Sequence, residues 1–135
     1  MKTLVDEFGS YAGKVWTTLN TQGPLKEDAL LKTTKLTEDE LWTAIGWLAR
    51  ENKICKDNNV YKLGQTNLTS KIGANAGKVW NTVAQLGEID VSTIARTAQI
   101  TEDDAYSALG WLARENKVRC KKMRAKEPKI KVSLL

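Results

Sequence analysis

The chain has 135 residues, a formal net charge of +5 and no histidine, so it lacks the commonest general base and the commonest metal ligand. The sequence contains no long apolar run, signal-peptide pattern, glycine-rich phosphate loop or nucleophile elbow. These features predict a cytoplasmic protein that spans no membrane, has no cofactor and is not an enzyme. Two cysteines, Cys55 and Cys120, favour reduced thiols over a disulfide framework.

Three helices are predicted in the first half of the chain. The first ends at Gly23, a short extended piece follows at Leu25, and the second helix covers about residues 26–33. Thr37, followed three residues later by Glu40, forms a capping box that starts the third helix. The buried stripe of this third helix is predicted to consist of Leu41, Ala44, Ile45 and Leu48.

After the third helix the hydrophobic period changes from that of a helix to that of a strand. Residues 54–56 and 60–63 flank a tight turn and predict a two-stranded hairpin, and residues 64–71 predict a short polar connector. The order helix, short strand, helix, turn, helix, hairpin predicts a winged helix-turn-helix. This fold class is mostly α with small antiparallel β hairpins (α+β).

The second half of the chain repeats the first. The octapeptide "GWLARENK" begins at Gly46 and again at Gly110, and this offset of 64 positions gives 21 identities over the 46 positions from Gly9 to Ile54. The repeat predicts two tandem winged helix-turn-helix domains, 1–64 and 65–135. In the second domain the apolar face of the first helix is predicted to hold Ala76, Val79, Trp80 and Val83.

Two longer motifs carry a resemblance to a known family. "IGANAGKVW" at residues 72–80 and "ALGWLARENKV" at residues 108–118 resemble short single-domain bacterial and archaeal winged helix-turn-helix proteins of largely unknown function. The first domain has the same motifs as "FGSYAGKVW" and "AIGWLARENKI". The chain departs from that family in being a tandem. If single-domain members pair as homodimers, domain 1 and domain 2 are expected to pair internally as a pseudo-dimer.

The third helix of each domain is a candidate DNA-contacting element, because a winged helix places this helix in the major groove. With Leu41 pointing inward, the outward-facing candidates are Thr43 and Arg50 in domain 1 and Ser107 and Arg114 in domain 2. However, the first turns of both helices are acidic, which suits the helix dipole and repels phosphate. A salt bridge with a nearby acid fits the two arginines equally well.

Two mid-helix glycines, Gly46 and Gly110, also need an explanation. A glycine within a helix costs about 1 kcal/mol relative to alanine, so its presence in both copies indicates a close approach. We expect either the neighbouring tryptophan ring or a helix from the other domain to make that approach. Trp47 and Trp111 are predicted to be packing anchors rather than exposed stacking platforms.

The positive charge is concentrated in the second hairpin. Residues 1–64 have nine basic and nine acidic side chains, whereas residues 65–135 have twelve and seven. This predicts a basic wing that lies along a DNA backbone with its tip in or beside the minor groove, although lysines that only protect a sheet edge remain an alternative. The candidate DNA-binding residues of the wing are Arg119, Lys121, Lys122, Arg124, Lys126, Lys129 and Lys131.

Two functions are consistent with these features. The first is a double-stranded DNA-binding protein, either a transcription regulator or a nucleoid-associated protein, that contacts mainly the phosphate backbone. The alternative is a protein-interaction adaptor built from tandem winged helices, with an acidic protein as a possible partner.

Overall fold

The structure is a computed structural model, and it describes residues 3–122 and 130–135. In the first half of the chain three helices precede a hairpin, in the predicted order. Its elements are α1 (Leu4–Gln22), β1 (Leu25–Lys26), α2 (Glu27–Thr34), α3 (Glu38–Arg50), β2 (Ile54–Asp57) and β3 (Val60–Leu63).

The second half has the same order, preceded by a π-helical turn, η1 (Thr69–Gly73), that runs directly into the first helix. Its other elements are α4 (Ala74–Leu86), β4 (Ile89–Asp90), α5 (Val91–Ala98), α6 (Glu102–Arg114), β5 (Val118–Lys122) and β6 (Ile130–Leu134). The polar connector predicted over residues 64–71 is therefore too long, because helical structure already begins at Thr69.

Each hairpin is extended into a three-stranded antiparallel sheet by the short strand before the second helix. The strand orders are β1-β3-β2 and β4-β6-β5. Leu25 pairs with Tyr61 in the first sheet, and Ile89 pairs with Val132 in the second. The wing is thereby attached to the helix-turn-helix part of its own half.

The helix ends follow the local signals in the sequence. The backbone N–H of Glu40 donates to the Thr37 hydroxyl at 3.2 Å, and the Thr37 N–H donates to the Glu40 carboxylate at 2.9 Å, which completes the predicted capping box. Gly23 and Gly87 end α1 and α4 with φ values of 82° and 79°. Left-handed backbone of this kind favours glycine, so both helices stop where the sequence predicts.

The two hydrophobic cores each take side chains from both halves of the chain. Leu4 and Phe8, at the start of α1, are buried in the core of the second half. Conversely, Ile72 of η1 is buried in the core of the first half. Phe8 and Ile72 are equivalent positions of the repeat, so the exchange is reciprocal.

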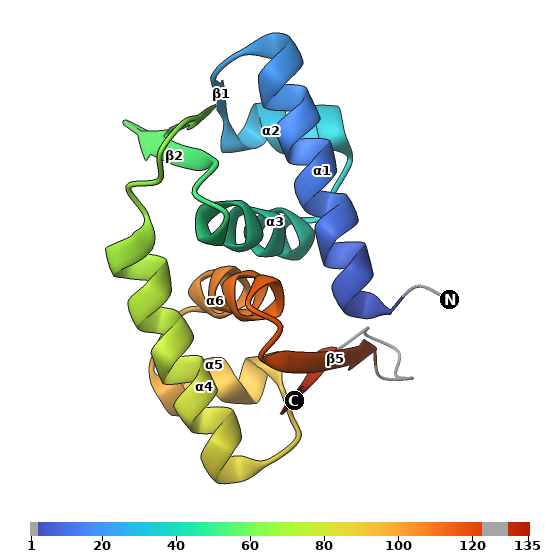
Figure 1. Cartoon of the computed structure of the whole chain (residues 1–135), viewed down its shortest axis with the longest axis vertical. Coiled ribbons are helices and arrows are strands. Elements are labelled where there is room, and N and C mark those ends of the chain that lie inside the picture. The colour runs from blue at the N-terminus through green and yellow to red at the C-terminus, as the bar shows by residue number, and fades with distance from the viewer. Residues whose placement is uncertain (1–2, 123–129) are drawn as a thin grey trace.

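The third helices of the two halves, α3 and α6, lie side by side in the middle of the molecule, with α1 along one side and α4 along the other (Figure 1). A Cβ atom placed on Gly46 of α3 would overlap the carbonyl oxygen of Ser107 in α6. A Cβ atom on Gly110 of α6 would overlap the carbonyl oxygen of Thr43 in α3. The expectation of a close approach at both glycines is confirmed, and the approaching group is the helix of the other half.

Candidate nucleic-acid interface

The basic hairpin of the second half presents its cations to solvent. Arg119, Lys121 and Lys122 are exposed on β5, whereas Val118 and Cys120, which alternate with the first two cations, are buried. Lys121 lies opposite Lys131 in the ladder between β5 and β6. Like charges in this arrangement repel one another, and the carboxylate of Glu88, 3.2 Å from the Lys121 ammonium, offsets part of that repulsion.

Seven candidate residues were assigned to this wing from the sequence. Four of them, Arg119, Lys121, Lys122 and Lys131, lie on the described strands, with Lys131 partly buried. The other three, Arg124, Lys126 and Lys129, lie outside the described residues. Arg119, Lys121 and Lys131 lie on the outward face that the alternating pattern predicts, whereas Lys122 lies opposite Ile130 and beside Leu4 and Phe8, on the side of Val118 and Cys120.

Two of the candidates on the third helices do not fit a DNA-contacting role. Thr43 is only 1% exposed and Ser107 only 6%, because each lies under the other half's third helix. The Thr43 hydroxyl donates instead to the Asp39 carbonyl of its own helix at 2.8 Å. The prediction that these two side chains face DNA is wrong, since the outward face of each half is the face that packs on the other half.

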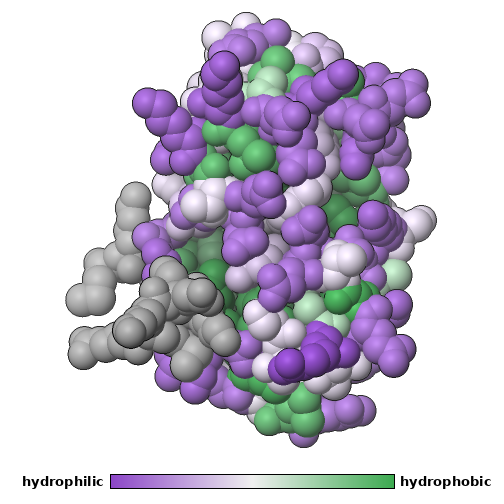
Figure 2. All heavy atoms as spheres, turned by 180° about the vertical axis from the view of Figure 1, so that it is seen from behind, coloured by the Kyte–Doolittle hydropathy of each residue, from purple (hydrophilic) through white to green (hydrophobic). Residues whose placement is uncertain are grey.

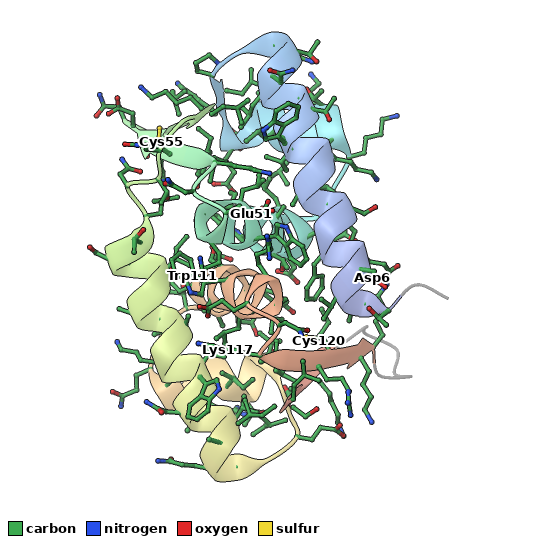
Figure 3. The ribbon with its side chains drawn as sticks, in the orientation of Figure 1. Asp6, Glu51, Cys55, Trp111, Lys117 and Cys120 are labelled. Atoms are coloured by element: carbon green, nitrogen blue, oxygen red, sulfur yellow. The ribbon has the colours of Figure 1, made fainter. Side chains whose placement is uncertain are left out.

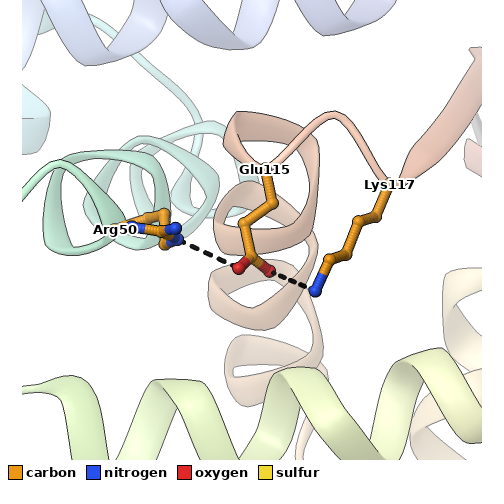
Figure 4. Close-up of polar contacts among 3 residues, drawn as sticks. All are labelled: Arg50, Glu115 and Lys117. Carbon is orange, nitrogen blue, oxygen red and sulfur yellow. Dashed lines mark hydrogen bonds and ion pairs between the residues drawn. The ribbon is translucent and has the colours of Figure 1, made fainter.

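The arginines of the third helices form ion pairs across the two halves. Arg50 Nε lies 3.0 Å from Glu115, and Arg114 Nε lies 3.0 Å from Glu51. Each of these glutamates also forms an ion pair with the lysine two residues further along the chain. The Lys117 ammonium, for example, lies 3.5 Å from the Glu115 carboxylate (Figure 4). The arginine side chains remain about half exposed, so they form salt bridges, one of the two alternatives that the sequence left open, and still face solvent.

The same arginines also stack on tryptophans of the opposite half. The Arg50 guanidinium carbon is 5.7 Å from the Trp111 ring centre, and that of Arg114 is 6.0 Å from the Trp47 ring centre. Both tryptophans pack against both hydrophobic cores, which agrees with their predicted role as anchors. Each arginine therefore holds a cation over an aromatic face of the other half.

The opposite ends of α3 and α6 bring acids together. Burial raises the pKa of the Asp39 carboxyl, and the nearby carboxylates of Glu102 and Asp103 raise this pKa further. A Tyr106 hydroxyl that donates to Asp39 partly counteracts the rise. Because a phosphate would meet this negative field, the first turns of the third helices are a poor place for a nucleic-acid backbone.

One exposed pair of aromatic residues was missed by the sequence analysis. Trp80 was predicted on the apolar face of its helix, but it is 40% exposed, and its equivalent Trp16 is 38% exposed. The buried face of α4 is centred instead on Ala76, Val79 and Val83, with Asn75 and Thr82 beside them. The exact repetition of "AGKVW" was the sequence feature that could have identified this pair. An exposed tryptophan is not needed for core packing, so its recurrence points to another role.

Within residues 3–122 and 130–135, no helix is long and apolar enough to span a bilayer, and no cluster of three potential ligands could hold a metal ion. On the face shown in Figure 2, hydrophilic side chains predominate and hydrophobic side chains form separate patches. Both cysteines are free and buried, and burial raises the pKa of Cys120 to about 12.

The fold and its repetition define a tandem winged-helix protein. The chain belongs to the winged helix-turn-helix domain family DUF2582, whose model matches it twice, over residues 2–64 and 67–132. No curated protein and no solved structure matches the chain. Winged helix-turn-helix domains generally bind DNA and typically are not enzymes.

Proposed function

We propose that this protein binds double-stranded DNA through phosphate contacts made by the β5–β6 wing. The observation that carries the proposal is the position of the cations. Arg119, Lys121 and Lys122 are exposed on β5, whereas the third helices, which normally read the major groove, are packed against each other. The wing is therefore a basic surface of the winged-helix fold that is free to follow a duplex.

Binding of this kind depends little on base sequence. Phosphate contacts position a protein on a duplex without reading its bases. The buried Thr43 and Ser107 side chains support this view, because side chains inside the protein are not available for base edges. A nucleoid-associated protein, or a regulator whose specificity comes from another factor, fits this behaviour better than a sequence-specific repressor.

The test is fluorescence anisotropy with a labelled random-sequence duplex of about 20 base pairs, titrated at several salt concentrations. We expect the logarithm of the association constant to fall linearly with the logarithm of the salt concentration, with a slope of about −0.9 per phosphate contact. The variant Arg119→Glu/Lys122→Glu removes two contacts. It should bind at least about tenfold more weakly and show a slope shallower by about two.

A matched control separates a local contact from a change in net charge. Lys26→Glu/Lys32→Glu reverses two exposed lysines in the first half and alters the net charge by the same amount. This control should bind the duplex nearly as well as the unmodified chain. Equal losses in the two double variants, or no duplex binding at low salt, would overturn the wing proposal.

The second candidate function is a protein-interaction adaptor. It is favoured by the packing of α3 against α6, which removes the usual DNA-reading face from the surface. An adaptor predicts no duplex binding at low salt, where electrostatic attraction is strongest. The same titration therefore decides between the two functions.

A further inference from the structure

Two equivalent grooves lie beside the third helices, one in each half of the chain. The first is lined by α1 and the end of α3 and has a volume of about 310 Å³, and the second is lined by α4 and the end of α6 and has a volume of about 640 Å³. Trp16 and Trp47 line the first groove, and Trp80 and Trp111 line the second. Figure 3 shows Trp111 and Lys117 of the second groove and Glu51 of the first between α1 and α4.

The residues that line these grooves are repeated more faithfully than the fold requires. Eight of the nine residues that line the first groove are identical to their equivalents in the second. Between residues 9 and 54, by comparison, 21 of 46 positions are identical. The repeated residues include the exposed Trp16 and Trp80, which make little contribution to either core.

Glycines on the groove-lining helices have no explanation inside the protein. A Cβ atom on Gly13 of α1 or on Gly77 of α4 would meet no atom within 4 Å. Glycine within a helix is less favourable than alanine, and nothing in the described structure requires its small size at these two positions. A group that approaches from outside the protein would supply that requirement, as the third helices do at Gly46 and Gly110.

Each groove is completed by a cation from the other half. Arg50 pairs with Glu115 and covers Trp111 in the second groove, while Arg114 pairs with Glu51 and covers Trp47 in the first. The rim cations Arg50, Arg114, Lys53 and Lys117 all have side chains at least 46% exposed. The two glutamates are at most 18% exposed and each contacts two of these cations, so positive charge dominates the rim.

We propose that the paired grooves bind single-stranded nucleic acid, with unpaired bases stacked on Trp16 and Trp80 and phosphates held by the rim arginines and lysines. Exposed aromatic rings beside a basic rim are the combination that single-stranded nucleic acids require. The open glycines let a flat base lie against the helix backbone. The ion pairs between the halves join the two rims, so one strand can pass from the first groove to the second.

This site is distinct from the duplex-binding wing and does not depend on it. A duplex hides its base faces within the stack, so the tryptophans have no role in contacts made only to phosphate. Groove variants should therefore affect single strands, and wing variants should affect duplexes. The failure of one proposal leaves the other standing.

The test uses the full chain and a labelled oligothymidylate of about 20 nucleotides. An abasic oligonucleotide of equal length is the matched ligand, because it carries the same phosphates without bases. We expect oligothymidylate to quench tryptophan fluorescence and to bind at least about tenfold more tightly than the abasic strand. Equal affinity for the two strands would overturn the stacking model.

Matched variants test the tryptophans directly. Trp16→Ala/Trp80→Ala should weaken oligothymidylate binding by roughly tenfold to a hundredfold, while Trp16→Phe/Trp80→Phe should retain most of it. Leu86→Ala, which removes another exposed apolar side chain of α4, should have no effect. Unchanged binding by the alanine variant, or equally strong competition by polyglutamate, would assign the face to an acidic protein and overturn the proposal.

Discussion

At the residue scale, Gly46 and Gly110 mark the point where the two halves of the chain touch. A Cβ atom on Gly46 would lie 2.7 Å from the carbonyl carbon of Ser107, and the group it meets is backbone that cannot rotate away. We expect Gly46→Ala to lower the free energy of unfolding by about 2–3 kcal/mol through overpacking, in spite of the better helix propensity of alanine. Urea denaturation followed by circular dichroism measures this change.

Gly13 provides the control for that prediction. It also lies within a helix, but a Cβ atom there meets nothing within 4 Å. Gly13→Ala should therefore raise the free energy of unfolding, by up to about 1 kcal/mol, because only the helix propensity changes. Similar effects of the two substitutions would contradict a tight contact between α3 and α6 at Gly46.

At the element scale, the acidic first turns of α3 and α6 make stability depend on pH. Burial and the carboxylates of Glu102 and Asp103 raise the pKa of Asp39 above its ordinary value of 3.8. The folded protein then holds this proton more tightly than the unfolded chain, so stability falls as pH rises through this interval, and the loss persists at neutral pH. Asp39→Asn should remove this loss and still accept the Tyr106 hydroxyl.

The expected gain at pH 7 is less than about 1 kcal/mol, because water screens the repulsion at an exposed carboxylate. The gain should vanish at a pH well below 3.8, where Asp39 is protonated in both states. Thermal unfolding between pH 3 and pH 7 measures the difference. The comparison variant Glu88→Gln, which loses an ion pair with Lys121, should show no gain in stability at neutral pH. If the stability difference between Asp39→Asn and the unmodified chain stays constant over this pH range, the proposed repulsion is excluded.

Element boundaries and element faces differ in how far the sequence specifies them. Local chemistry determines the boundaries, so the Thr37 capping box and the glycines at the ends of α1 and α4 were predictable. By contrast, what packs on a given face of a helix depends on the rest of the molecule. The polar face that carries Thr43 appears outward within one half and becomes buried only when α6 packs on it. The repeated mid-helix glycines were the one local sign of that packing.

At the scale of the whole molecule, the contacts between the halves obey a pseudo-twofold relation. The repeat relates the ion pair Arg50–Glu115 to the ion pair Arg114–Glu51. It also relates the contact of Gly46 with Ser107 to the contact of Gly110 with Thr43. Such an isologous arrangement uses the same surface on both sides and closes on itself. We infer that the intact chain satisfies this surface internally and remains a monomer of 15.0 kDa in solution.

The excised second half provides the sharpest test of that inference. Without the first half, the α6 face and the core region covered by Leu4 and Phe8 become exposed. A second copy can cover both, because Arg114 and Glu115 are equivalent to Arg50 and Glu51, and Ile72 is equivalent to Phe8. We therefore expect residues 66–135 to sediment as a dimer while the intact chain sediments as a monomer.

Gly110→Ala in the fragment should shift it toward monomer or unfolded chain, whereas Gly77→Ala, at an open position, should leave the dimer intact. A dimeric intact chain, or a fragment that folds as a stable monomer, would show that α3 and α6 do not form a closed pair.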